Sequence, residues 1–526
     1  MSDAQLMLNT MQALPRHGSP LFRDSQQMSL ADIPNGNYSN GQTTFQLQTI
    51  ENDMFCLAGM ELQIPFSVSV NGVLSAVNCL GQGVSPALTA GQVAAIPATF
   101  AAGIPNNGAP TIPGVALASA SQCSFAFKSS SLDMVSGLNV GLGASNSSIV
   151  SDVNYLPIMS QIRLTVQNSD DWLRVFGSKL CFAPDTRKSI TVGEQNTGFC
   201  QRQASLYSQS TCDWFPLPGA AANSTVVYCS RLQGVATIPL HLLHPFLSSS
   251  DYLDRGVNYR LNFLFGREFN QQALTSCFVF AGAVPTTKPT YAIGGQVSAG
   301  GASWSSCMLR YRSVSLPPEV QVKFDSALLA GKADDRVVRY SCSDYYDSVQ
   351  NSALSLSSYQ LSNGIVRPLR MWCLGFTPQA LASQTLLRTT SVVWSSLNAR
   401  IGTTRRYIND LVDGPGLYEE LRDQFEEMAT SPDKQSLLDY QSFYPTPGTI
   451  VSPNGEAFPP QSGQAHYAVV DLSRTQNRAN DSALTLQVNA IRTGNTPADF
   501  LVIVEREQVA TISRARNAVT VQVGST

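Results

Sequence analysis

Charged residues are scarce in this chain of 526 residues. Asp, Glu, Lys and Arg make up 13% of it, about half the share of an ordinary globular domain. The formal net charge is only -3, and the basic pairs Arg187-Lys188, Arg405-Arg406 and Arg514 with Arg516 are dispersed. Binding to a phosphate backbone requires a clustered basic surface. The sequence therefore gives no support for direct, sequence-specific recognition of nucleic acid.

Long apolar runs and paired cysteine motifs are also missing. No stretch reaches the 18 or so apolar residues that cross a bilayer, and the N-terminus lacks the basic start and apolar run of a secretory signal. The eleven cysteines include no CxxC pair and no Cys/His zinc spacing. We therefore expect synthesis in the cytosol, with the cysteines acting as small buried apolar residues.

Strand patterns dominate what is present. Apolar and polar residues alternate in TTFQLQTI (43–50), QIRLTVQ (161–167), VNYRLNFLF (257–265) and ALTLQVNAI (483–491), which is typical of half-buried strands. FLVIV (500–504) is apolar throughout and suits a strand covered on both faces. Each half of the chain offers about eight strands, the number that a jelly roll requires. The predicted fold class is all-β, with two consecutive eight-stranded jelly-roll barrels and short helices in the loops.

The same patterns suggest a division of the chain. Residues 1–40 are largely polar and predict an N-terminal arm. Residues 41–330 predict a first jelly roll with a long loop insertion, because residues 62–127 contain no charged side chain and much of 80–120 is rich in Ala, Gly and Pro. Residues 331–526 predict a second jelly roll. The polar run KADDRV (332–337) marks the candidate boundary.

Two helical segments interrupt the strand pattern. One is TIPLHLLHPFLSSS (237–250), and the other is DGPGLYEELRDQFEEM (413–428). The second carries an apolar stripe at helical spacing, formed by Leu417, Leu421, Phe425 and Met428. We predict that this stripe docks on the second barrel as a structural helix. Its acidic residues are then expected to face outward; they are Glu419, Glu420, Asp423, Glu426 and Glu427.

No pattern in the sequence indicates a chemical site. His241 and His244 have the i, i+3 spacing of two metal ligands, but no third ligand shares their helix, and a helix whose histidines bond backbone or water explains them as well. GLNVGLGAS (137–145) lacks the GxGxxG spacing of a phosphate loop. No nucleophile, base and orienting group occur together. We predict no catalytic, cofactor-binding or metal-binding residues and no enzymatic activity.

Several longer segments resemble a known family. Among them are SIVSDVNYLPIMSQI (148–162), GVATIPLHLLHPFLSSSDYLDRGVNYRLNFLF (234–265), NGIVRPLRMWCLGF (363–376) and HYAVVDLSRTQNRANDSALTLQVNAIRTGNTPADFLVIVERE (466–507). In matching order over most of residues 30–510, they resemble the double jelly-roll major capsid proteins of the adenovirus and tailless-phage lineage. The polinton-like virus and virophage capsid proteins are the most similar members.

The resemblance implies a structural role. Three copies would form a pseudo-hexagonal homotrimeric capsomer of an icosahedral DNA virus shell. The chain would be made in the host cytosol and located in the virion. The implied partners are neighbouring capsomers, penton proteins and minor or cement capsid proteins. The resemblance leaves open whether an internal membrane lies beneath the shell.

A carbohydrate-binding or adhesive β-sandwich is the alternative function. Chains rich in strands, Asn and Thr also form lectins, which would require exposed aromatic platforms or a calcium-binding carboxylate cluster. The five tryptophans are scattered and no Asp-x-Asp loop is present. A glycan array would separate the two functions.

Overall fold

The computed structural model describes strands, helices and short connections along the whole chain. The described residues are 21–28, 41–48, 53–72, 124–142, 148–149, 156–184, 197–216, 228–249, 252–253, 258–265, 277–281, 290–293, 307–315, 318–319, 322, 326, 336–350, 356–365, 367–376, 393–401, 404–412, 415–424, 437, 450–451, 457–458, 468–473, 482–491, 498–515 and 518–524. The predicted Ala/Gly/Pro-rich insertion at 80–120 lies outside them. Within these residues, no helix is both long and apolar enough to cross a membrane.

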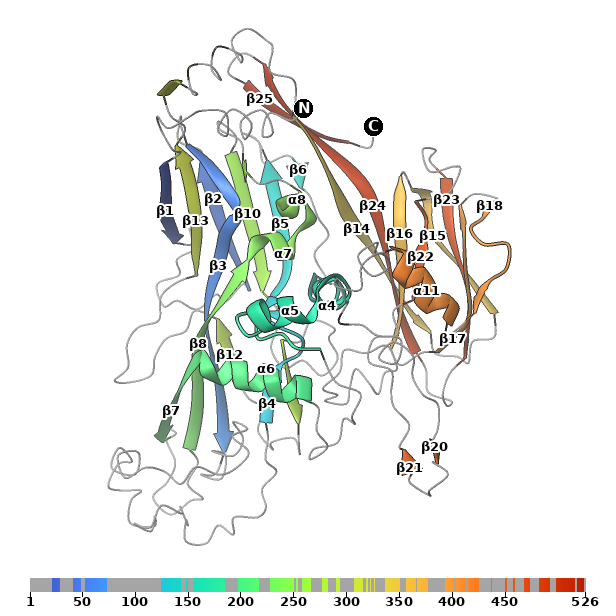
Figure 1. Cartoon of the computed structure of the whole chain (residues 1–526), viewed down its shortest axis with the longest axis horizontal. Helices are drawn as coiled ribbons and strands as arrows, with labels where there is room; N and C mark the ends of the chain where they lie inside the picture. The colour runs from blue at the N-terminus through green and yellow to red at the C-terminus, as the bar shows by residue number, and fades with distance from the viewer. Residues whose placement is uncertain are drawn as a thin grey trace.

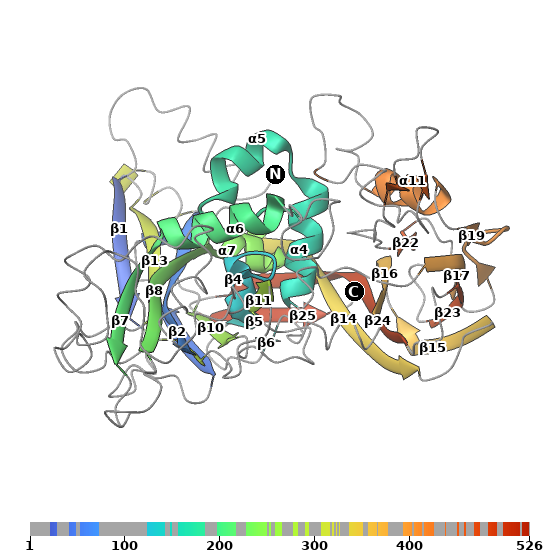
Figure 2. The same cartoon turned by 90° about the horizontal axis from the view of Figure 1, so that it is seen from below.

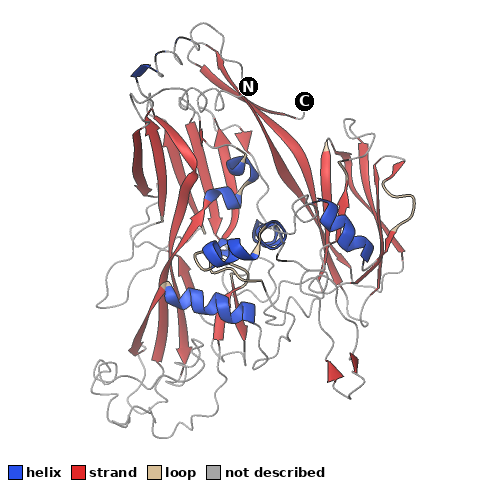
Figure 3. Cartoon of the chain, in the orientation of Figure 1, coloured by secondary structure: helices blue, strands red, loops and turns tan. Residues whose placement is uncertain are grey.

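The first unit contains two antiparallel sheets that enclose a common core (Figures 1 and 3). The larger sheet has the order β1 (Leu21–Met28), β13 (Met308–Ser315), β3 (Asp53–Gly72), β8 (Tyr228–Pro239) and β7 (Ser210–Pro216), with β9 (Tyr252–Leu253) and β12 (Thr290–Ile293) also paired to β3. The second sheet has the order β2 (Gln42–Gln48), β10 (Asn258–Phe265), β5 (Val135–Leu142) and β6 (Ser148–Ile149). A separate pair joins β4 (Ser124–Phe127) to β11 (Phe278–Ala281).

The strand count of the first unit differs from the predicted eight, because β3 is unusually long. Its 20 residues extend about 66 Å at the usual rise of a strand. On one edge it pairs first with β13 and then with β12, and on the other with β9 and β8. Along each of its edges, β3 thus pairs with two strands in succession. The described sheets of the first unit therefore have seven and four strands, more than the eight that were predicted.

The second unit repeats this plan. One sheet has the order β14 (Arg336–Gln350), β24 (Ala498–Ala515), β16 (Pro368–Phe376) and β22 (Ala468–Asp471), with β25 (Ala518–Gly524) on β24. The other has the order β15 (Leu356–Ile365), β23 (Ser482–Ile491), β17 (Val393–Ile401) and β18 (Thr404–Arg405), with β19 (Leu411–Val412) on β17. β20 (Ile450–Val451) and β21 (Ala457–Phe458) form a separate pair.

Helices are few and short (Figure 3). Those with described bounds in the first unit are η2 (Ser131–Met134), α4 (Leu156–Gln167), α5 (Asp170–Trp172), η3 (Leu173–Gly177), α6 (Thr197–Ser208), α7 (Leu240–Leu243) and α8 (Pro245–Ser248). The second unit has α11 (Pro415–Gln424). Seen from below, α5 and α11 project from the same side of the molecule (Figure 2).

Several strand predictions are confirmed. In β10, Tyr259, Leu261 and Phe263 are buried and alternate with exposed or half-buried neighbours, so this strand has one face on the core. In β24, Leu501 to Val504 are all buried, as a strand covered on both faces requires. The segment at 237–250 is helical in part, since α7 and α8 bury Leu240, Leu243 and Phe246.

The prediction of a strand at 161–167 is wrong, because this segment belongs to the helix α4. Its alternation of Ile162, Leu164 and Val166 is real, and all three side chains are buried. The alternation arises because the helix is buried on more than one side, which places apolar residues off a single stripe. Pro157, tolerated in the first turn of a helix, was a signal for the helix start.

The prediction of an arm over residues 1–40 is wrong for residues 21–28. They form β1, which pairs with β13 from Leu21 opposite Ser315 to Met28 opposite Met308. In the described part of the larger sheet, β1 lies at the edge. The other proposed boundary, at 330/331, falls between the end of β13 and the start of β14 and stays a prediction.

Candidate functional site: the junction of the two units and the α11 dock

Helix α4 lies between the two units, where Figure 1 shows it end-on. Leu156 and Leu164 belong to the core of the first unit. Residues on another face of the helix belong to the core of the second unit; they are Ile158, Met159, Ile162 and Val166. Because one helix contributes to both cores, a movement of one unit relative to the other would expose apolar surface. Helix α4 therefore links the two units by apolar contacts with both cores.

A buried cluster of ion pairs includes Arg163 of α4. Glu505 of β24 is 1% exposed. Its Oε1 lies 3.4 Å from Nη2 of Arg163 on α4, and its Oε2 accepts a hydrogen bond of 2.6 Å from Nε of Arg370 on β16. One guanidinium thus comes from each unit. Glu505 therefore links α4 to β16 by ion pairs, in addition to the apolar contacts that α4 makes with both cores.

Two opposing effects act on the pKa of Glu505. Burial by itself raises the pKa, because it disfavours the charged form. The positive charges of Arg370 and Arg163 outweigh burial and hold the pKa below the ordinary value of 4.5. A carboxyl group whose pKa is lowered on folding contributes stability above its ordinary pKa, and this contribution is lost as the pH falls through the folded-state value. The junction should therefore weaken in acid.

Replacement of Glu505 by Gln is expected to lower the free energy of unfolding by about 3 to 5 kcal/mol at neutral pH, because two guanidiniums would lose their buried counter-charge. The loss of stability between neutral pH and about pH 3 should also be smaller in this variant than in the wild type. Chemical denaturation at several pH values measures both effects. Glu507→Gln is the matched control on the same strand, since its partner Arg339 is largely exposed and its loss should cost under about 1 kcal/mol. Equal effects of the two changes would contradict the role of Glu505.

The second unit holds α11 by an apolar contact and a polar network. Leu417 and Leu421 are fully buried and belong to the core of this unit. They are four residues apart and so lie on one face of the helix. Phe425 and Met428, the other members of the predicted stripe, lie outside the described residues. We propose that this stripe anchors α11 on the second unit.

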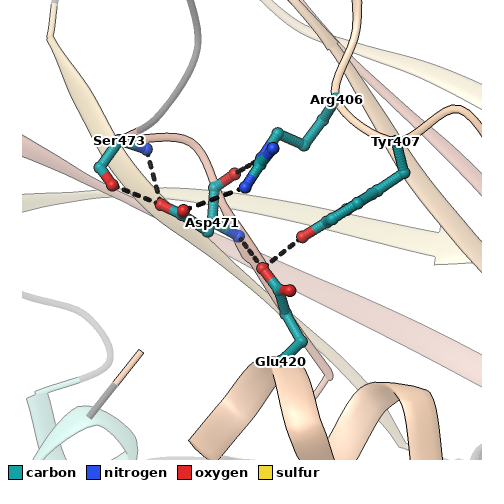
Figure 4. Close-up of polar contacts among 5 residues, drawn as sticks. All are labelled: Arg406, Tyr407, Glu420, Asp471 and Ser473. Carbon is teal, nitrogen blue, oxygen red and sulfur yellow. Dashed lines mark hydrogen bonds and ion pairs between the residues drawn. The ribbon is translucent and has the colours of Figure 1, made fainter. Parts of the chain in front are cut away.

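Figure 4 shows the polar network at the end of β22. Oε1 of Glu420 accepts hydrogen bonds from the backbone N–H of Asp471, at 3.0 Å, and from the Tyr407 hydroxyl. Oδ2 of Asp471 lies 3.1 Å from Nη2 of Arg406. Oδ1 of Asp471 accepts from the N–H and hydroxyl of Ser473 at 2.8 and 2.6 Å. The network joins α11, β22 and the connection between β18 and β19.

The network also determines the protonation of Tyr407. Burial raises the pKa of this phenol, and the negative charge of Glu420 raises it further. The hydroxyl therefore stays protonated and donates to Glu420. The prediction that the acidic residues of this helix face outward is wrong for Glu420, although Glu419 and Asp423 are exposed. Glu420 directly precedes Leu421 in the helix, and its carboxylate reaches the backbone N–H of Asp471 on β22. The sequence pattern of the helix did not reveal this donor.

The other candidate residues have local structural roles. Nδ1 of His244 accepts a hydrogen bond of 3.0 Å from the N–H of Phe246 and so caps α8. Burial lowers the pKa of His241, with Glu61 opposing and Lys179 reinforcing the shift. Within the described segments, no three His, Cys, Asp or Glu side chains are grouped as metal ligands. Residues 137–142 of the glycine-rich segment belong to β5, and Arg405 forms an ion pair with Asp410.

Sequence reasoning missed the junction residues Arg163, Arg370 and Glu505. Arg163 is one of the polar residues that alternate with apolar ones in the predicted strand at 161–167, and Glu505 directly follows the apolar run at 500–504. A charge adjoining a fully apolar strand is the one signal that could have indicated a buried ion pair.

Comparisons with known proteins bear on the fold. No protein-family model matches the sequence, and no curated protein matches it. A chain of the Sputnik virophage, solved by cryo-EM, has a TM-score of 0.57 and 10% identity, with 98% of this chain and 90% of that chain covered.

Two further structures match over similar lengths. A chain of the quasi-atomic model of the PBCV-1 virus capsid has a TM-score of 0.38 and 9% identity, covering 97% of this chain and 98% of that one. The major capsid protein P2 of bacteriophage PM2 has a TM-score of 0.31 and 8% identity, covering 95% and 100%. The likeness to the Sputnik virophage chain extends over both units, and the predicted all-β fold with short helices in its loops is confirmed. The number of jelly-roll barrels stays a prediction.

Proposed function

We propose that this protein is the major capsid protein of an icosahedral virus and forms pseudo-hexagonal homotrimeric capsomers. The observation that carries the proposal is the likeness to a chain of the Sputnik virophage particle over 98% of this chain. The resemblance of the sequence segments to double jelly-roll capsid proteins supports it independently. In this proposal the chain is a structural component of the virion and not an enzyme.

The junction supports a building-block role on physical grounds. A capsomer that tiles a shell needs both of its barrels held at a constant angle, because each barrel contacts different neighbours. Helix α4 belongs to both cores, and Glu505 pairs with an arginine from each unit. These contacts oppose movement of one unit relative to the other, and a capsomer that tiles a shell requires such resistance.

Association should also satisfy the sheet edges. β1 and β7 are the outer strands of the larger sheet of the first unit. Unpaired edge strands are hazards unless they are covered, and adjacent barrels of a trimer would cover them. Neighbouring capsomers, penton proteins, minor or cement capsid proteins and an internal membrane are the further partners of the proposed shell.

The purified protein is expected to sediment as a trimer at micromolar concentration. Obligate assemblies usually bury more than about 2,000 Å² at each interface, with an apolar centre. Analytical ultracentrifugation gives the mass, and electron microscopy of the same sample should show blocks of hexagonal outline with three-fold symmetry. A stable monomer in native buffer would contradict the proposal.

A further inference from the structure

Two histidines lie close together in a short helical segment of the first unit, here called the α7–α8 segment and defined as residues 240–248. His241 belongs to α7, and His244 directly precedes α8. Histidine is the side chain whose charge ordinarily changes between about pH 5 and 8. The whole chain has four histidines, so this segment holds half of them.

His244 is buried in a form that excludes a proton on Nδ1. The residue is 3% exposed, and its Nδ1 accepts a hydrogen bond of 3.0 Å from the N–H of Phe246, which caps α8. A ring nitrogen that accepts a hydrogen bond does not carry a proton, so the imidazole is neutral with its proton on Nε2. Charging His244 would add a proton at Nδ1 and remove the cap of α8.

His241 also lies in an environment that disfavours its charged form. Among the described residues, its Nδ1 is buried and has no hydrogen-bond partner. Burial lowers the pKa of His241 below the ordinary value of 6.5, while Glu61 opposes this shift and Lys179 adds to it. Glu61 lies opposite Pro239 in the pairing of β3 with β8 and is ion-paired with Lys179. A proton on His241 would therefore meet a carboxylate that already has a cationic partner.

The elements packed around the segment supply no unpaired carboxylate among the side chains that the structure describes. Helix α7 packs against β3, β8 and α4, and α8 packs against β14 and β3. The described charged side chains on these elements are all ion-paired; the pairs are Glu61 with Lys179, Arg163 with Glu505, Arg339 with Glu507 and Asp344 with Arg506. Tyr340 and Cys342 of β14 are neutral, because burial raises the pKa of both. New positive charge on the segment would thus lack a free counter-charge.

The α7–α8 segment contacts a strand of the second unit. Helix α8 buries Phe246, whose ring lies 5.4 Å from the Tyr340 ring of β14, centroid to centroid and edge-on. Cys342 shares a face of β14 with Tyr340, because alternate residues of a strand point the same way. Both residues belong to the core of the first unit, although β14 pairs with β24 in the sheet of the second. The helix that His244 caps therefore holds β14 against the first unit.

We propose that the α7–α8 segment is a proton-responsive contact between the two units, which loosens when His241 and His244 become charged. Charging removes the cap of α8 and places a positive group beside the ion pair of Glu61 and Lys179. Phe246 then loses its fixed position against Tyr340. The response occurs within one chain and does not require a trimer.

Acid is therefore expected to destabilise the chain at a pH well above the range in which Glu505 responds. The unfolded chain binds protons on both histidines near the ordinary histidine pKa, whereas the folded segment disfavours them. Because the unfolded state then binds more protons, the free energy of unfolding falls as the pH drops below about 7. Each unit by which the folded-state pKa of a histidine is lowered reduces the folding equilibrium constant by up to about tenfold.

Chemical denaturation of the full chain between about pH 7.5 and pH 5 tests this response. The wild type should lose stability over this range, and the double variant His241→Gln with His244→Asn should not. Asn is chosen because its Oδ1 accepts from the Phe246 N–H in place of Nδ1, and because Asn is a favoured capping residue. His244→Asn alone should lose part of the pH dependence. Glu505→Gln is the control and should keep the wild-type dependence.

Two outcomes of the denaturation experiment would overturn the proposal. One is a wild type whose stability is constant between about pH 7.5 and pH 5. The other is a double variant that loses as much stability over this range as the wild type does, since the response would then come from other groups.

Thiol labelling locates the response within the fold. Cys342 and Cys373 are buried free cysteines on β14 and β16, which both pair with β24. Cys373 belongs to the core of the second unit and is the matched control. In the native wild type, 4,4′-dithiodipyridine should label Cys342 about tenfold faster relative to Cys373 at about pH 5.5 than at about pH 7.5, because only the α8 contact opens. Mass spectrometry of the digested protein identifies the labelled residue.

The ratio of the two labelling rates decides the place of the response. It should not change with pH in the double variant, which keeps both histidine positions neutral. Equal acceleration of Cys342 and Cys373 in the wild type would show that the whole chain opens. That result, or a ratio that does not change with pH, would overturn the assignment of the response to the α7–α8 segment.

Discussion

Leu421→Asp is expected to unfold the second unit and prevent trimer formation. Leu421 is fully buried in the core of that unit together with Leu417. A carboxylate at this position would have no counter-charge in an apolar environment, which costs far more than the loss of a contact. We expect destabilisation of more than about 4 kcal/mol, in the range that follows from burying an unpaired charge. Thermal unfolding, solubility and ultracentrifugation measure the effect.

The matched control for this change is Glu419→Asp, which places the same side chain on the exposed face of α11. Glu419 forms a surface ion pair with Arg422, and such pairs contribute little to stability. The control should fold and assemble as the wild type does. Normal assembly of Leu421→Asp would show that α11 does not anchor the second unit, and the proposed structural role of the apolar stripe would be abandoned.

A chain that ends at residue 497 is expected to lose both units, not only the second. The deletion removes β24 and β25. β24 pairs with β14 over all fifteen residues of β14 and also with β16. Its middle part belongs to the core of the second unit, through residues that include Val502 and Val504. The loss of this strand removes the partner of β14 and leaves β16 paired only with β22 among the described strands, so that core is opened.

The first unit depends on the same strand pair. Val338, Tyr340 and Cys342 of β14 and Ala510 of β24 belong to the core of the first unit. The Tyr340 ring packs edge-on against the Phe246 ring of α8, with centroids 5.4 Å apart. The strands β14 and β24 thus run from one core to the other (Figure 1). Because the C-terminal strands complete the first unit, the two units are expected to fold together.

Limited proteolysis and circular dichroism test this dependence. The chain ending at 497 should be insoluble or lack a cooperative unfolding transition. A chain ending at residue 515, which keeps β24 and lacks β25, is the control and should retain both cores. A stable, protease-resistant fragment of residues 21–315 released from the longer deletion would contradict the dependence of the first unit on β14 and β24.

Local patterns in the sequence were enough to identify elements that bury a single face. The alternation in VNYRLNFLF predicted β10, and the spacing of Leu417 and Leu421 predicted the buried stripe of α11. A half-buried strand and a half-buried helix each produce one periodicity, two or 3.6 residues, because water covers the other face. The fold class followed from the number of such strands.

The elements between the two units depended on tertiary structure. Helix α4 packs into both cores, so apolar residues occupy several of its sides and the pattern resembled a strand. Glu505 is buried because Arg163 and Arg370 reach it from different units. Residues so far apart in the chain leave no local pattern, since the free energy of a buried charge depends on partners that only the folded chain brings near. The sequence by itself thus determined half-buried strands such as β10 and the α11 helix, and tertiary contacts decided the form of α4 and how the two units are joined.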